Sequence, residues 1–257
     1  LQSELTIAQE VQANLFPHAA RSLPTLELHG ICRPARTVSG DYYDFLVFHH
    51  QDRNGGSHNG AGTAPAEIVS LAADPVATNG NGALRESGVG IVLGDISGPG
   101  ISAALLMATL HSAVRAYRFA SEDLVYSETT LAGVATVSDT APREGLGGDS
   151  GKLFESPGRI LSLLNRHLFR STQPEKYATL FLAHYDATSS RLTYSNAGHL
   201  PPLVLSRDGQ VRRLDRGGTV VGLMDNMRYE EGHVDLRSGD ILIAYSDGVT
   251  EPENDFG

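Results

Sequence analysis

The chain has 257 residues, of which 40% are hydrophobic and 19% charged, and its formal net charge is −10 at pH 7. These values predict a globular protein with a sizeable core, and the negative charge argues against binding to nucleic acid or to an anionic membrane surface. No apolar run approaches the roughly 20 residues of a membrane span. The single cysteine, Cys32, excludes an intrachain disulfide and a cysteine zinc site, and it favours a cytoplasmic location.

The first 15 residues predict a helix. Leu1, Leu5 and Leu15 fall near heptad spacing, and Pro17 ends the pattern. Because the pattern is already under way at its first residue, we interpret residues 1–18 as a linker or coiled-coil helix from a missing upstream domain. A packing helix of the same domain is the alternative. The heptad spacing is also compatible with a homodimer through this helix.

Residues 26–48 predict two strands, with Cys32 as a core residue inside the first. The turn Ser-Gly-Asp places Asp41 at the start of the second strand, and Asp44 follows three residues later. Since side chains alternate along a strand, these two carboxylates should point to opposite faces. Only one of them can serve a given site, and we favour Asp41 because the preceding glycine allows a ligand to approach closely.

Residues 88–101, GVGIVLGDISGPGI, combine an apolar strand pattern, an acidic residue and a glycine-rich turn. The strand leads into Asp95, and a helix that is apolar on nearly every face follows at 101–119. Two interpretations remain open: Asp95 directs its carboxylate at a metal or a phosphate, or it caps the helix. Two segments rich in small and polar residues, about 50–88 and 121–155, flank this region and predict loop insertions.

A helix with one apolar face should begin at Ser156-Pro157, and the rest of the chain predicts short strands. The expected strands are 178–186, 191–196, 202–205, 211–214, 229–236 and 240–245. Asp208-Gly209 and Ser238-Gly239 resemble tight connections between antiparallel strands. The last strand, in DILIAYSDG, leads into Asp247 and a glycine turn, as the earlier strand leads into Asp95.

Three aspartates that follow Gly or end strands, with no cysteine nearby, suit hard divalent cations such as Mg²⁺ and Mn²⁺. Two such ions could activate a water for attack on phosphorus. The alternative is that Asp41, Asp95 and Asp247 merely stabilise turns. The chain has no phosphate-binding P-loop and no nucleophile elbow. The segment NAGHLPP forms a turn whose His199 could orient a loop or contact a substrate.

Six motifs in order resemble the PPM-type metal-dependent serine/threonine phosphatases, in their bacterial SpoIIE/RsbU-like branch. They are AQEVQANLFP, SGDYYDF, GDISGPGISAALLMA, YATLFLAHYD, NAGHLPP and YSDGVTEPEN. The resemblance implies an α+β fold, a four-layer αββα sandwich of two antiparallel sheets flanked by helices, over residues 19–257. It also implies two Mn²⁺ or Mg²⁺ ions at one end of the sandwich.

By the same resemblance, Asp41, Asp95 and Asp247 become catalytic metal ligands, and the backbone carbonyl of Ile96 a further one. The implied reaction is hydrolysis of phosphoserine or phosphothreonine on a protein, typically an anti-sigma-factor antagonist in bacterial partner switching. An upstream sensor domain would act through the linker helix. The family's motif Asp-Asp-x-Thr, which supplies one more aspartate, would lie beyond Gly257, which leaves open whether this fragment is active.

Two other functions compete with this one. A non-catalytic regulatory module would keep the sandwich and bind an antagonist protein, but the loss of metal carboxylates is its usual signature, and all three aspartates are present. A metal-dependent phosphodiesterase is the second, and the ordered motifs argue against it. The sequence identifies neither the phosphoprotein substrate nor the upstream signal.

Overall fold

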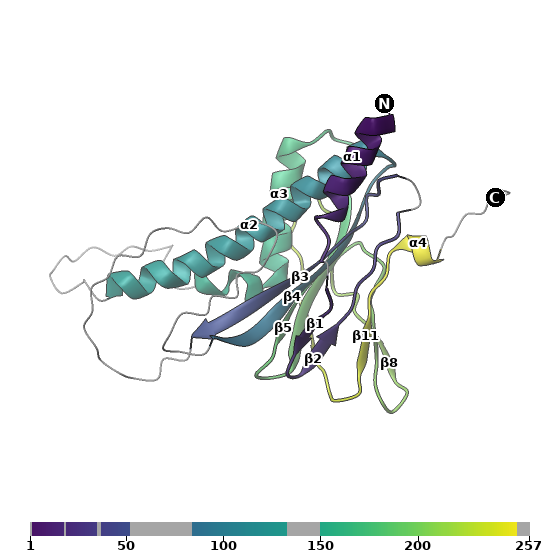
Figure 1. Cartoon of the computed structure of the whole chain (residues 1–257). Helices are drawn as coiled ribbons and strands as arrows, with labels where there is room; N and C mark the ends of the chain where they lie inside the picture. Colours follow the sequence, from purple (N-terminus) through teal and green to yellow (C-terminus); the bar gives the residue numbers. More distant parts are fainter. Residues whose placement is uncertain (1, 18, 35–36, 52–83, 133–149, 251–257) are drawn as a thin grey trace.

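The computed structural model describes residues 2–17, 19–34, 37–51, 84–132 and 150–250, which form the predicted α+β fold (Figure 1). The larger sheet has six strands in the order β10-β6-β5-β4-β3, with β9 beside β6. All neighbours are antiparallel except β6 and β9. Its strands are β3 (Tyr42–Gln51), β4 (Leu84–Ile96), β5 (Ala178–Asp186), β6 (Arg191–Ala197), β9 (Gly217–Gly218) and β10 (Gly232–Asp235).

Two small antiparallel sheets accompany the larger one. One has the order β11-β7-β8, and the other pairs β1 with β2. Their strands are β1 (Arg21–Leu23), β2 (Leu26–Leu28), β7 (Leu203–Leu205), β8 (Val211–Arg213) and β11 (Ile241–Ile243). A buried cluster joins the sheets: Phe45 and Ile91 of the larger sheet share it with Leu23 of β1 and Val204 of β7.

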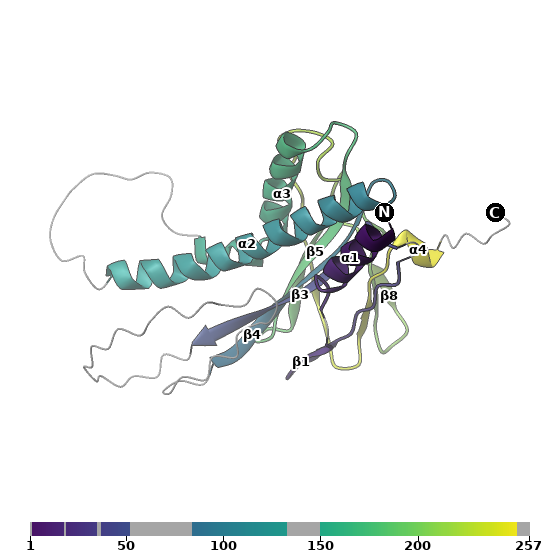
Figure 2. The same ribbon diagram turned by 45° about the horizontal axis from the view of Figure 1, so that its top comes forward.

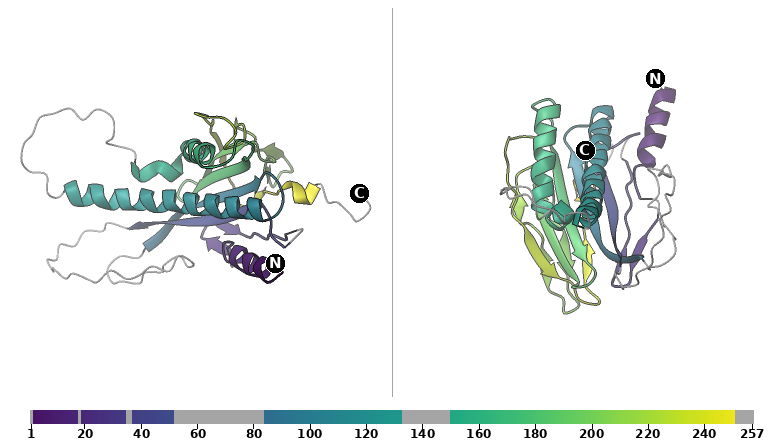
Figure 3. Two further views of the ribbon diagram at one scale, coloured as in Figure 1. Left: turned by 90° about the horizontal axis from the view of Figure 1, so that it is seen from above. Right: turned by 90° about the vertical axis from the view of Figure 1, so that its left-hand side faces the viewer.

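Helices cover the opposite face of the larger sheet. Those that pack on it are α2 (Ile101–Ala132) and α3 (Pro157–Ser171), with a 3₁₀ helix η1 (Ser150–Glu155) before α3. Helix α1 (Gln2–Ala13) lies beside α2, and the short α4 (Asp247–Thr250) follows β11. The three long helices lie side by side in the end-on view of Figure 3, and Figure 2 shows how far α2 extends beyond α3. No helix in the described ranges has an apolar stretch long enough to cross a membrane.

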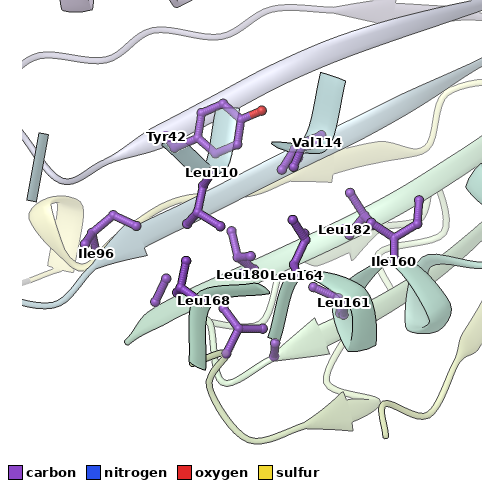
Figure 4. Close-up of a cluster of buried hydrophobic side chains, with 14 of the residues drawn as sticks. Tyr42, Ile96, Leu110, Val114, Ile160, Leu161, Leu164, Leu168, Leu180 and Leu182 are labelled. Atoms are coloured by element: carbon purple, nitrogen blue, oxygen red, sulfur yellow. The ribbon is translucent and has the colours of Figure 1, made fainter. Parts of the chain in front are cut away.

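The core under the helices depends mainly on α3 (Figure 4). Ile160, Leu161, Leu164 and Leu168 recur at helical spacing and are fully buried against Leu180 and its neighbours in β5. Each such side chain contributes about 1.5–3 kcal/mol on burial. This packing fixes the strands whose ends carry the candidate site.

The predicted loop at 121–155 is wrong at both ends. Helix α2 continues to Ala132, and η1 occupies Ser150–Glu155. The helix continues because no Gly or Pro occurs between Ile101 and Gly133. The predicted insertion at 50–88 is shorter as well, since β3 reaches Gln51 and β4 begins at Leu84, and residues 52–83 lie outside the described ranges.

One turn and the surroundings of two residues also differ from the prediction. Asp208-Gly209 does connect two paired strands, β7 and β8, but Gly239 connects β10 to β11, which belong to different sheets. Cys32 lies after β2 and is only half-buried, so its placement inside a strand is wrong. Leu105 is 65% exposed, because only one face of α2 packs on the sheet.

The outer face of the three-stranded sheet is apolar and exposed. Ile241, Ile243 and Val211 are each more than 40% accessible to solvent. Within the described part of the chain, the long helices cover only the other side of the sandwich (Figure 3). The two packed sheets and one helical layer of the predicted sandwich are therefore present in this part.

Candidate metal centre

Adjacent strands bring Asp41 and Asp95 to the same sheet edge. Asp95 is the penultimate residue of β4, and Asp41 immediately precedes β3. Because Tyr42 pairs with Gly94 in the antiparallel register, the residues that follow Gly94 lie beside those that precede Tyr42. Asp95 lies inside β4, six residues before the first residue of α2, so its interpretation as a helix cap is wrong.

Gly40 allows the two segments to approach each other closely. A Cβ atom at this position would lie 2.9 Å from the carbonyl oxygen of Ile96 and 3.3 Å from Oδ1 of Asp95. The first distance is shorter than real Cβ contacts. A side chain at residue 40 would therefore displace the Ile96 carbonyl and the Asp95 carboxylate, the two groups that the family resemblance implies as metal ligands.

The two carboxylate oxygens of Asp41 have different surroundings in the described part of the chain. Its Oδ2 accepts a hydrogen bond from Ser39 Oγ at 2.9 Å, and its N–H donates to the same hydroxyl at 3.0 Å. Its Oδ1 is buried and has no hydrogen-bond partner within the described ranges. Because an unpaired buried oxygen is costly, this atom suits a bound cation.

The electrostatics of Asp95 also fit a cation. Burial, followed by the negative charges of Asp41 and Asp247, raises the pKa of Asp95 to about 6. A hydrogen bond with the backbone of Ile96 opposes this rise. Carboxylates that repel one another in a half-buried site are stabilised by a divalent cation, whose preferred ligands are oxygens.

Asp247 lies farther out than the other two aspartates. It is the first residue of α4, and its side chain is exposed. Across the residues that the structure describes, no group of three His, Cys, Asp or Glu side chains is close enough to hold a metal ion. The structure thus brings Asp41, Asp95 and the Ile96 carbonyl together, and leaves Asp247 near enough to act on Asp95 only through its charge.

The NAGH segment builds a tight turn beside this edge. Asn196 Oδ1 accepts a hydrogen bond from the N–H of His199 at 2.7 Å, and Asn196 Nδ2 donates to the His199 carbonyl at 3.0 Å. Gly198 has a φ of 70°, which favours glycine. The turn leaves His199 5% exposed.

Hydrogen bonds connect the loop after β4 to the residue that precedes β5. Ser97 N–H donates to the Tyr177 carbonyl at 2.9 Å, and Tyr177 N–H donates to Ser97 Oγ at 3.0 Å. Lys176 Nζ donates to Ser102 Oγ at 3.3 Å. This cation beside the glycine turn was missed in the sequence, because a single lysine before a strand carries no distinctive signal.

Known proteins resemble this chain over most of its length. The family model described as stage II sporulation protein E (SpoIIE) matches residues 85–257. Protein IcfG of Synechocystis is 26% identical over 96% of this chain and 32% of its own length. The phosphoserine phosphatase RsbU of Bacillus subtilis is 24% identical over 100% of this chain and 56% of its own length. The chain thus spans between a third and just over half of these relatives.

Two solved structures share the fold at low sequence identity. The SiaA-PP2C domain of Pseudomonas aeruginosa matches 94% of this chain and 69% of its own, with a TM-score of 0.51 and 14% identity. RsbX in complex with magnesium matches 91% of this chain and 80% of its own, with a TM-score of 0.50 and 13% identity. With the family model covering well over half of its residues, the chain belongs to the stage II sporulation protein E (SpoIIE) family.

Proposed function

We propose that this chain is the phosphatase part of a protein that hydrolyses phosphoserine or phosphothreonine on a protein substrate with Mn²⁺ or Mg²⁺. One observation carries the proposal: the Oδ1 of Asp41, which has no hydrogen-bond partner among the described residues, lies at the sheet edge where Asp95 and the Ile96 carbonyl meet Gly40. The relative RsbU is named a phosphoserine phosphatase, which supports the reaction class.

In this proposal, Asp41, Asp95, Asp247 and the backbone carbonyl of Ile96 hold two cations. The cations would supply positive charge to the phosphate and lower the pKa of a water. Two other residues of the chain support these ligands. Gly40 allows the Ile96 carbonyl and the carboxylates to lie close together, and Ser39 orients the Asp41 carboxylate by a hydrogen bond. Asp247, exposed at the start of α4, would join the other ligands when the cations bind.

For the substrate, we propose a phosphorylated anti-sigma-factor antagonist, which the motif resemblance implies. We further propose that residues 1–18 connect an upstream sensor domain to a phosphatase domain at 19–257. Helix α1 supports this role, because its Gln12 is hydrogen-bonded to Ser39 next to the candidate site, and because Ile7 and Val11 are exposed for contact with another helix. The relatives are much longer than the chain, which leaves room for such a domain.

The test is hydrolysis of a phosphoserine peptide and of a phosphorylated antagonist domain by the full-length protein that contains this chain, with Mn²⁺, Mg²⁺ or chelator. We expect turnover that depends on the metal and falls at least 100-fold in Asp95→Asn, a loss of about 2.7 kcal/mol in transition-state stabilisation. Asp215→Asn, at an exposed position, is the matched control and should retain activity. Binding of the antagonist domain with no turnover in any metal would contradict the proposal and favour the regulatory module.

A further inference from the structure

We propose that His199 is a positioning residue that connects the strand end carrying Asp95 to the segment carrying Asp247. The proposal rests on the proposed metal centre and extends it to a residue outside the set of ligands. It assigns a role to the NAGH turn, which the proposed function has not used.

The first connection runs through Thr179. This residue pairs directly with Asp95 in the register of β5 and β4. Its Oγ1 donates to the Asp95 carbonyl at 3.4 Å and shares a 2.9 Å hydrogen bond with His199 Nδ1. The imidazole is therefore joined to the end of β4 by two consecutive hydrogen bonds.

The second connection runs toward α4. The other ring nitrogen, Nε2, is buried and has no well-formed hydrogen bond within the described part of the chain. The backbone of Tyr245, two residues before Asp247, lies close enough to the ring to affect the pKa of His199. Burial lowers the pKa of His199, whereas Tyr245, Asp41 and Asp247 act in the opposite direction. The ring thus lies between the two segments and close to the charges of the candidate ligands.

The backbone that carries the ring is held in place by hydrogen bonds, as a positioning residue requires. Both backbone groups of His199 bond to the Asn196 side chain, and Asn196 Nδ2 also donates to the Leu214 carbonyl at 3.3 Å. A Cβ at Gly198 would lie 2.8 Å from Val220 Cγ1, so the turn packs tightly on the next segment. Groups that orient metal ligands typically need this kind of support.

Loss of the ring should loosen both connections while leaving every candidate ligand in the chain. Removing a group that orients metal ligands typically costs 10–100-fold in metal affinity. We therefore expect His199→Ala to bind Mn²⁺ about 10–100-fold more weakly than the unchanged chain. Thr179→Val, which keeps the shape but removes the hydroxyl, should show a loss in the same direction.

The chain offers a matched control. His233 of β10 shares a 3.1 Å hydrogen bond between its Nδ1 and Thr193 Oγ1, but this pair is exposed. His233→Ala and Thr193→Val therefore remove the same kind of hydrogen bond without touching Asp95. We expect both control variants to bind Mn²⁺ as the unchanged chain does.

The measurement is calorimetric titration of the metal-free 257-residue chain with Mn²⁺, with circular dichroism to check folding. His199→Asn should recover part of the affinity, because its amide can still reach Thr179. If His199→Ala does not fold, Thr179→Val and His199→Asn decide. Unchanged affinity in Thr179→Val and His199→Ala, an equal loss in the His233→Ala control, or no Mn²⁺ binding by the unchanged chain would overturn the proposal.

This experiment separates the proposal from the proposed function. A chain that binds Mn²⁺ but hydrolyses no phosphoserine substrate would contradict the phosphatase activity alone. The affinity difference between His199→Ala and His233→Ala would still decide the role of His199. Active turnover with equal Mn²⁺ affinity in both variants would overturn the positioning role alone.

Discussion

Gln12 and Ser39 form a closed pair of hydrogen bonds between α1 and the loop that leads to Asp41. Gln12 Nε2 donates to the Ser39 carbonyl at 2.7 Å, and Ser39 N–H donates to Gln12 Oε1 at 3.0 Å. Gln12 is 5% exposed, so water cannot easily replace either bond. The position of α1 is thereby connected to the backbone that orients a candidate metal ligand.

The first prediction concerns this contact. Gln12→Ala leaves two polar groups of Ser39 without partners, and it should lower the free energy of unfolding by roughly 1–3 kcal/mol. Urea denaturation followed by circular dichroism measures the change. Gln9→Ala in the same helix, where the side chain is exposed, is the control and should have little effect. Equal effects of the two substitutions would show that the contact contributes nothing beyond helix propensity.

Gly40→Ala should separate the two halves of the candidate metal centre. Its new Cβ would meet the Ile96 carbonyl at 2.9 Å, so this backbone must shift. We expect Mn²⁺ affinity to fall more than about 10-fold, as for other displaced metal ligands, in a chain that still folds. Gly90→Ala is the control, because its Cβ would meet Leu46 and Phe154 at ordinary distances of 3.4 Å. Calorimetric titration of both variants checks the prediction, and equal affinities would contradict it.

Local patterns predicted much of the fold. Alternating apolar residues predicted β5 with its bounds, and the apolar face of α3 predicted that helix from its first residue. The end of α2 was missed because Ser, Thr and Glu at 121–132 resemble loop composition, although they also occur in exposed helices. The strand β9 was missed because two glycines carry no hydrophobic pattern.

The candidate site was only partly accessible from the sequence. The family resemblance predicted that Asp41, Asp95 and Asp247 lie together at one end of the sandwich, and the structure brings Asp41 and Asp95 to one sheet edge. Contacts between distant residues had no local signal: Asp44 and Arg115 are 71 positions apart and Gln12 and Ser39 are 27 apart. Such pairs depend on how helices pack on the sheet, which the pattern of one segment does not contain.

The buried ion pair under α2 gives the third prediction. Asp44 is completely buried, and Arg115 donates to both of its carboxylate oxygens at 2.9 Å. Arg115→Met leaves that carboxylate without its cation and should lower the free energy of unfolding by about 3–5 kcal/mol. The double variant that also carries Asp44→Asn should lose less, because neither position of the pair then holds a buried charge.

Arg191→Met is the control for this pair. Arg191 donates to Asp235 at 2.8 Å with both side chains more than half exposed, so we expect little change in stability. Urea denaturation of the four proteins provides the comparison. Equal losses in Arg115→Met and Arg191→Met would contradict the role of burial.

His111 gives a prediction about pH. Burial lowers the pKa of His111, the nearby Asp44 raises it, and Arg115 lowers it. Because the folded pKa lies below the unfolded value of about 6.5, the unfolded chain binds the proton first, and stability is lost as the pH falls below about 6.5. His111→Gln should lose stability less steeply than the unchanged chain between about pH 7.5 and 5. Urea denaturation across this range measures the free energy of unfolding at each pH. His167→Gln, at an exposed position, is the control. The same dependence of stability on pH in His111→Gln and in the unchanged chain would contradict the prediction.

The substitution Asp95→Asn should make the chain more stable than the unchanged chain without metal and less stable than it in Mn²⁺. The raised pKa of Asp95, about 6, means that its charged form is disfavoured in the folded chain, so its contribution to stability is lost as the pH rises through that value. Without metal at pH 7.5, the substitution should therefore raise the thermal midpoint by roughly 2–4 °C, about 1 kcal/mol after screening by solvent. In Mn²⁺ the unchanged chain gains about 2.7 kcal/mol at 100 times the dissociation constant, and the variant, with one ligand lost, gains less. Thermal denaturation with chelator and with Mn²⁺ should thus rank the two proteins in opposite orders, and the same rank in both conditions would contradict a metal role for this carboxylate.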